Sequence, residues 1–145
     1  MEGDRSQLGR AAFLIGLLFS PTLAIAADWR YLTSGNGGVI VQVDTDSIRE
    51  LPPIQIQRPF PVRQIWVKMD YSQDKSVTYR ESRALHRFHC DAETSTIVSE
   101  VIYNPNGGVV RSRSEEDYDF HYRPITPDTI GYAIMEFACG RRSVL

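Results

Sequence analysis

The fold is decided by the stretch Ile97–Arg111, which has the sequence IVSEVIYNPNGGVVR. Its centre, Asn106-Gly107, is the strongest short-range signal for a hairpin, because both residues tolerate the positive φ angles of a tight turn. β-Branched residues, which favour strands, lie on both sides of this turn. We therefore predict two antiparallel strands, over residues 97–103 and 109–111.

Four segments upstream of the hairpin also have the composition or alternation of strands, namely residues 29–32, 39–44, 63–71 and 78–90. The most regular alternation lies in 63–71, where Ile65, Val67 and Met69 fall on one face and Trp66 and Lys68 on the other. Short turns join the segments. Such connections favour antiparallel pairing, because a parallel crossover needs about a dozen residues or more.

Three connections have distinct compositions. Residues 34–38 are rich in glycine and predict a turn, and the polar segment 45–50 can form one helical turn. Residues 51–61 contain four prolines, so we expect a loop or an edge segment there.

The last element is predicted to be a helix. Thr126 is the expected N-cap, followed by Pro127 at the first helical position and by Asp128 near the positive end of the helix dipole. Gly140 is expected as a left-handed C-cap. Helical spacing predicts one apolar face, made of Ile130, Ala133, Ile134, Phe137 and Ala138.

Together these elements predict an α+β fold: an antiparallel sheet of about five or six strands with a C-terminal helix packed on one face. Residues 27–145 are predicted to form a single domain, which buries roughly two-thirds of its unfolded surface. The formal net charge of −2 argues against nucleic-acid binding, which needs a basic surface. No apolar run after the first 26 residues approaches membrane-spanning length.

Residues 1–26 have the pattern of a secretory signal peptide. Two arginines precede an apolar run over 11–19, and the small-x-small triplet Ala24-Ile25-Ala26 precedes the expected cleavage site. An uncleaved anchor is the alternative, but the run is shorter than the roughly 20 residues of a spanning helix. After cleavage at Ala26 or Ala27, we expect an extracytoplasmic product in the periplasm, secreted or at the cell surface. We expect no lipid anchor, because no cysteine lies near the expected cleavage site.

The chain has two cysteines, Cys90 and Cys139, and both lie in the exported part. In an oxidising compartment such a pair is expected to form one structural disulfide. A catalytic thiol is the alternative, but neither cysteine lies in a redox or protease motif. One feature is awkward: Cys139 points about 180° away from Ile130 on a regular helix, so the bridge requires the last turn to unwind or the helix end to lie across the sheet.

The His86-Arg87-Phe88-His89 segment raises the question of a metal site. On a strand these two imidazoles point to opposite faces about 10 Å apart, so they cannot share one ion. We therefore expect no metal and interpret His86 as a hydrogen-bonded residue at the edge of the core. The mixed-charge run 112–117 lacks the ligand spacing of calcium loops, and 35–38 lacks the helix that a phosphate-binding loop precedes. The sequence predicts no enzyme activity and no cofactor.

Between residues 117 and 123, Tyr118, Phe120 and Tyr122 alternate with polar residues that include His121. This pattern is compatible with an exposed aromatic binding surface. It is more often an edge strand whose aromatic rings pack on the core.

Several short motifs occur in a characteristic order through nearly the whole mature chain. They are Asp28-Trp29, residues 43–48, residues 65–68, Phe88-His89-Cys90-Asp91, the hairpin of residues 103–112, and residues 124–129 opening a helix that ends in Ala138-Cys139. This ordered set resembles the surface-adhesin protein E-like domain family of exported Gram-negative proteins. The resemblance implies a sheet with a disulfide-tied C-terminal helix and a non-enzymatic role, which for the eponymous adhesin is attachment to host matrix or serum proteins. It identifies no binding residues in this chain.

Three hypotheses follow. The leading one is an exported binding or adhesion module of the cell envelope, with extracellular-matrix, host or envelope proteins as partners. The second is a small periplasmic ligand-binding protein or enzyme, with a pocket formed by His86, Tyr118, Phe120, His121 and Tyr122. The third is an envelope structural protein that forms a homodimer through an exposed sheet edge.

Overall fold

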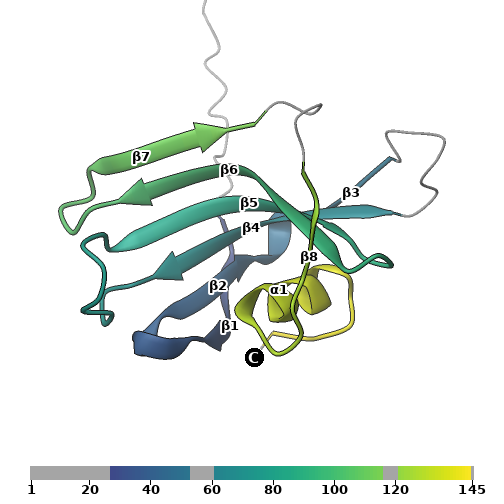
Figure 1. The fold of residues 1–145 in the computed structure, drawn as a ribbon, viewed down its shortest axis with the longest axis horizontal. Coiled ribbons are helices and arrows are strands. Elements are labelled where there is room, and N and C mark those ends of the chain that lie inside the picture. The colour runs from purple at the N-terminus through teal and green to yellow at the C-terminus, as the bar shows by residue number, and fades with distance from the viewer. Residues whose placement is uncertain (1–26, 53–60, 116–120, 145) are drawn as a thin grey trace, which may run out of the picture.

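A computed structural model describes residues 27–52, 61–115 and 121–144 of the chain. The predicted signal peptide, residues 53–60 of the proline-rich segment, and Tyr118 and Phe120 lie outside these ranges. Figure 1 shows a curved sheet with helix α1 against one of its faces. In the described ranges, no helix is long and apolar enough to cross a membrane.

Six strands form the main ladder of the sheet in the order β1-β2-β4-β5-β6-β7, and each neighbouring pair is antiparallel. Their bounds are β1 Trp29–Ser34, β2 Ile40–Asp44, β4 Val62–Asp70, β5 Glu81–His89, β6 Thr94–Tyr103 and β7 Val109–Ser114. The predicted antiparallel sheet is thereby confirmed. At the decisive hairpin, the Asn104 N–H donates to the Gly108 carbonyl at 2.9 Å, and Gly107 has a φ of 81°.

Four short elements complete the description. Strand β3, Arg49–Leu51, pairs with β4, and strand β8, Arg123–Pro124, pairs with β6. Two 3-10 turns, η1 Asn36–Gly38 and η2 Thr45–Ser47, flank β2. The second is the predicted helical turn in the polar segment, and the Asp44 side chain caps it by accepting from the Asp46 N–H. Strands of two or three residues have no measurable periodicity, so the sequence did not predict β3 and β8.

Alternation along β4 divides its side chains between two faces, as predicted. Ile65 and Val67 are buried and pack with Phe88 of β5 in the hydrophobic core. Ile134 and Met135 of the helix belong to the same cluster. Helix α1 therefore covers this face, where it contacts β1 and β4 (Figure 1).

Helix α1 spans Ile130–Ala138 and begins one turn later than predicted. Its N-cap is Thr129, whose hydroxyl oxygen accepts from the Tyr132 N–H at 3.2 Å. The same hydroxyl donates to the Thr126 carbonyl at 2.7 Å. The prediction of Thr126 as N-cap is wrong because Asp128 adopts a φ of 59°, which breaks the helical path between the two threonines.

The end of α1 agrees with the prediction. Gly140 has a φ of 75°, and its N–H donates to the Phe137 carbonyl at 3.0 Å. The Arg141 N–H donates to the Glu136 carbonyl at 2.7 Å. This pair of bonds is a Schellman motif, which satisfies carbonyls that the helix end leaves without partners.

The buried face of α1 is displaced from the predicted one. Met135, which the predicted apolar stripe omitted, is fully buried, whereas Ile130 and Phe137 are only partly buried. Cys139 follows Met135 by four residues, so it lies only about 40° from it around the helix axis. The disulfide therefore requires no unwinding of the last turn, and the Cys139 N–H still donates to the Met135 carbonyl at 2.8 Å.

Candidate functional site

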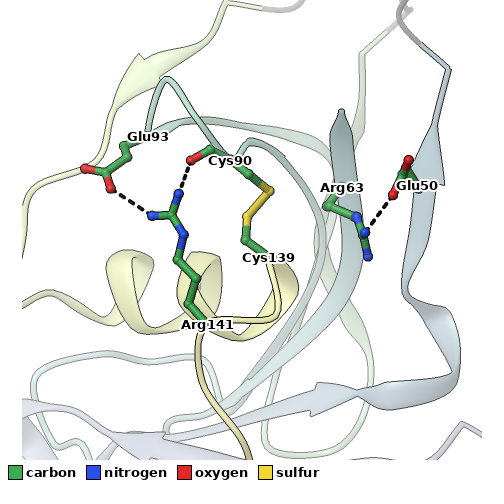
Figure 2. Close-up of a disulfide and its surroundings, with 6 residues drawn as sticks. All are labelled: Glu50, Arg63, Cys90, Glu93, Cys139 and Arg141. Carbon is green, nitrogen blue, oxygen red and sulfur yellow. Dashed lines mark hydrogen bonds and ion pairs between the residues drawn. A yellow bond between two sulfur atoms is a disulfide. The ribbon is translucent and has the colours of Figure 1, made fainter. Parts of the chain in front are cut away.

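A disulfide joins Cys90 and Cys139, whose Cα atoms lie 5.8 Å apart across 49 residues of sequence. Cys90 directly follows β5, and Cys139 is the C-cap of α1. Figure 2 shows the bond bridging the helix end to the turn after β5. The structure therefore contains the disulfide expected from the sequence, in a position that holds the helix on the sheet.

Arg141 makes a second connection beside the disulfide (Figure 2). Its guanidinium donates to the Cys90 carbonyl at 2.8 Å and to the Glu93 carboxylate at 2.9 Å. A separate ion pair in the same view, Arg63 with Glu50 at 2.6 Å, links β4 to β3. These contacts have a structural role, because each one joins two segments of the protein to each other.

The larger of two described cavities lies between the end of β1, the η1 turn and the first turns of α1, and its volume is about 730 Å³. Much of its lining is polar and includes Ser34, Asn36, Tyr132, Glu136 and Arg142. Small-molecule sites commonly have volumes of roughly 300–1,000 Å³. This cavity is therefore large enough for a small polar ligand.

Gly35 sets the wall of this cavity. A Cβ atom placed on it would lie 2.6 Å from the Cδ1 atom of Ile130, so the turn after β1 and the helix approach each other closely. A larger residue at this position would force the Ile130 side chain to move.

His86 lies on the helix-covered face of β5 and is 9% exposed. Its ring stacks on Phe88 with a centroid separation of 5.9 Å, and within the described ranges it makes no hydrogen bond, contrary to the expectation from sequence. Burial, and to a lesser extent the charge of Arg113, lowers the pKa of His86 to about 4. His86 is therefore a neutral core residue at physiological pH.

The other residues of the hypothesised aromatic pocket are dispersed. The Tyr122 ring packs on the buried His89 with a centroid distance of 4.2 Å. For Tyr122 this agrees with the prediction that the aromatic rings of this segment pack on the domain. His121 is exposed. Neither described cavity is lined by His86, His121 or Tyr122. Among the described residues, no three His, Cys, Asp or Glu side chains form a group that could hold a metal ion.

The sheet face opposite α1 carries a different set of side chains, and we call it the open face. Directly paired residues of antiparallel strands point to the same side, so the register assigns its members. Its partly or largely exposed members include Trp29, Tyr31, Gln42, Arg49, Gln64, Trp66, Lys68, Asp70, Glu81, Arg83, Leu85, Arg87, Val101 and Tyr103. The same register places Asp44, Val62 and His89 on this face, and all three are buried.

Two cations of the open face lie directly opposite each other: Lys68 on β4 and Arg83 on β5. Like charges in this arrangement repel. Each contacts an aromatic ring on another strand instead, Lys68 on β1 across β2 and Arg83 on the neighbouring β6. The Lys68 ammonium lies 4.9 Å from the centroid of the Trp29 ring, and the Arg83 guanidinium carbon lies 5.3 Å from that of Tyr103. These cation–π contacts hold both side chains along the surface of the sheet.

A second cavity, of about 330 Å³, lies at one end of the open face. Arg80, Glu81, Arg83, Tyr103 and Pro105 are among its lining residues. Arg83 donates to the Glu81 carboxylate at 2.6 Å inside it. The cavity thus extends the open face towards the β6–β7 hairpin and adds a basic side chain, Arg80.

Sequence reasoning did not identify the open face as a site. The alternation in 63–71 did place Trp66 and Lys68 on the face away from the core. It could not show that Trp29 on β1 and Tyr103 on β6 lie near the cations of this face, because that depends on pairing between distant segments. The described side chains offer cations, aromatic rings and polar groups on exposed surfaces, which suits them to binding.

The fold and these surfaces define an α+β sheet domain with a disulfide-tethered C-terminal helix and an exposed sheet face. The chain belongs to the surface-adhesin protein E family, whose model matches residues 29–140. This match confirms the resemblance seen in the sequence.

Solved structures of protein E from Haemophilus influenzae are similar to this chain. In crystal form II the identity is 17% and the TM-score 0.50, over 84% of this chain and 94% of that chain. Another protein E structure has 18% identity and a TM-score of 0.47, over 84% of this chain and 91% of that chain. At this identity the crystal form II match shows the fold alone. A comparison with curated proteins found no match.

Proposed function

We propose that the mature protein is an exported, non-enzymatic binding and adhesion module of the bacterial cell envelope. The observation that carries this proposal is membership of the surface-adhesin protein E family over residues 29–140. The partners of such a module are extracellular-matrix, host or envelope proteins. The protein acts outside the cytoplasm, in the periplasm, secreted or at the surface, after removal of residues 1–26.

The construction of the domain supports a binding role. The disulfide and Arg141 fix the helix on one face of the sheet. Among the described residues, the other face carries partly exposed aromatic and charged side chains such as Trp66, Lys68 and Arg83. Trp, Tyr and Arg are enriched at protein-binding surfaces, and a rigid scaffold lowers the entropy lost on binding.

Two measurements test the proposal. Cell fractionation with a tagged full-length chain should place the protein outside the cytoplasm. Purified residues 27–145 should bind at least one member of a panel of matrix, serum and envelope proteins, and a reduced and alkylated sample serves as the misfolded control. Cytoplasmic retention, or no binding across the panel with folded protein, would overturn the proposal.

The second candidate is a small-ligand binder that uses the cavity between η1 and α1, and its volume of about 730 Å³ favours that candidate. A thermal-shift screen of sugars, amino acids and other small polar compounds tests it. A ligand whose stabilising effect is lost in Tyr132→Ala but kept in Tyr31→Ala would establish this function, because only Tyr132 lines the cavity.

A further inference from the structure

Positively charged residues outnumber acidic ones on the open face, although the chain as a whole has a slightly negative net charge. The whole chain contains 16 Lys and Arg against 18 Asp and Glu. The open face and its adjoining cavity combine five basic residues, Arg49, Lys68, Arg80, Arg83 and Arg87, with three acidic residues, Asp44, Asp70 and Glu81. Asp44 is buried, and Asp70 and Glu81 are directly paired at the end of the β4–β5 ladder.

The central part of this face is basic and aromatic. Trp66 and Leu85 are directly paired, with the Lys68–Arg83 pair on one side of them and Gln64–Arg87 on the other. The side chain of Arg87 donates to the Gln64 side chain at 3.1 Å. Within the part of the chain that the structure describes, Lys68 forms no ion pair, so its charge is available to a ligand.

We propose that the open face binds an anionic polysaccharide, whose acidic groups pair with Lys68 and Arg83 and whose sugar rings lie against the aromatic side chains. This inference rests on the proposed binding function and assigns it a surface and a ligand class. Charge complementarity selects an anionic ligand. The mutual repulsion of Lys68 and Arg83, paired directly opposite each other, falls when an anion binds between them.

The shape of the face favours a polysaccharide over an acidic protein. Protein partners are typically anchored by side chains that fill pockets in the centre of an interface. Here the described cavity lies at the end of the face, and aromatic rings occupy its middle and flanks. A second copy of this chain is also disfavoured, because face-to-face packing brings the same cations together.

The test measures binding of folded residues 27–145 to four probes at low salt: heparin, polygalacturonate, neutral dextran and poly-L-glutamate. We expect binding to heparin or polygalacturonate, none to dextran, and weakening with added salt, because ion pairing with a charged polymer is screened. Binding to poly-L-glutamate alone would assign the face to an acidic protein and overturn the proposal. Absence of binding to both anionic polysaccharides would also overturn it, without affecting the outcome of the protein panel.

Substitutions place the binding on the open face. Lys68→Gln and Arg83→Gln should each weaken polysaccharide binding by about tenfold, and Trp66→Ala by about threefold or more. The matched control is Arg111→Ala, because Arg111 is an exposed arginine that does not belong to the open face. Its directly paired residue, Ile102, is buried on the helix-covered face, so Arg111 lies on that face too. Equal loss in the control would contradict the assignment. Chemical-shift mapping on the unmutated protein should show the largest changes in β4 and β5, whatever the variants' stability.

Discussion

Arg141 donates a hydrogen bond to the backbone carbonyl of Cys90 at 2.8 Å, although 51 residues separate them in the sequence. Cys90 is also the disulfide partner of Cys139, two residues before Arg141. The end of β5 is therefore held to the end of α1 both covalently and by a charged side chain. Because the helix is short, its position on the core depends on these two connections as well as on apolar packing.

Replacing Arg141 by alanine should lower the free energy of unfolding by about 1 kcal/mol. This is below the usual value for hydrogen bonds from charged groups, because the side chain is 40% exposed. Urea unfolding monitored by circular dichroism measures the change. Arg142→Ala is the matched control, and we expect a change within about 0.5 kcal/mol for it. Equal midpoints for the Arg141 variant and the unmutated protein would contradict the structural role of this contact.

Removal of the disulfide should lower the free energy of unfolding more than Arg141→Ala does. A bridge across 49 residues restricts the unfolded chain strongly, so Cys139→Ser should reduce the free energy of unfolding by about 2–5 kcal/mol. Chemical denaturation of the variant, and of the unmutated protein with and without reductant, measures this. The reductant should have no effect on Cys139→Ser. An unchanged midpoint in the variant would show that the two thiols are unpaired in solution.

The start of α1 provides a direct comparison of two threonines. Thr129→Ala removes the hydroxyl that accepts from the Tyr132 N–H, and N-cap losses of this kind cost about 1 kcal/mol. Thr126→Ala leaves in place the backbone carbonyl that Thr129 uses, so we expect a change within about 0.5 kcal/mol. Thermal and urea unfolding of both variants decides the question. A larger loss for Thr126→Ala would restore the sequence-based assignment of the N-cap.

The two threonines, Thr126 and Thr129, also show which part of the helix the sequence did not predict. The end of α1 was predictable, because glycine at 140 suits a positive φ angle and no competing signal lies nearby. The start was predicted at Thr126, but the N-cap is a threonine three residues later, Thr129. Only the positive φ of Asp128, an angle that sequence does not specify, selects Thr129.

The open face, too, could be predicted from the sequence only in part. Alternation within β4 predicted that Trp66 and Lys68 face away from the core, which is a local property of the strand. The contact between Lys68 and Trp29 joins strands β4 and β1, which lie on either side of β2. Contacts of this kind depend on the order of strands in the sheet, and one sequence does not determine that order.

The stability of the domain should fall as the pH drops from about 6.5 towards 4, because of His86. Burial lowers the pKa of this imidazole from 6.5 to about 4, so the unfolded chain binds a proton in this range that the folded protein does not. The expected loss reaches about 3 kcal/mol once the pH is below the folded-state pKa. The pKa values of Asp28 and Asp74 are lowered from 3.8 by hydrogen bonds, chiefly from Arg30 and Ser76 respectively, so their contributions are lost at lower pH than this window.

Urea unfolding of His86→Leu across pH 4 to 7 tests this assignment. The variant cannot take up the proton, so its stability should vary less with pH between 6.5 and 4 than that of the unmutated protein. The readout is the slope of stability against pH, which is independent of any constant cost of replacing the stacked ring. His121→Gln is the control, because His121 is exposed. If that control flattens the slope and His86→Leu does not, the pH sensitivity arises outside the core.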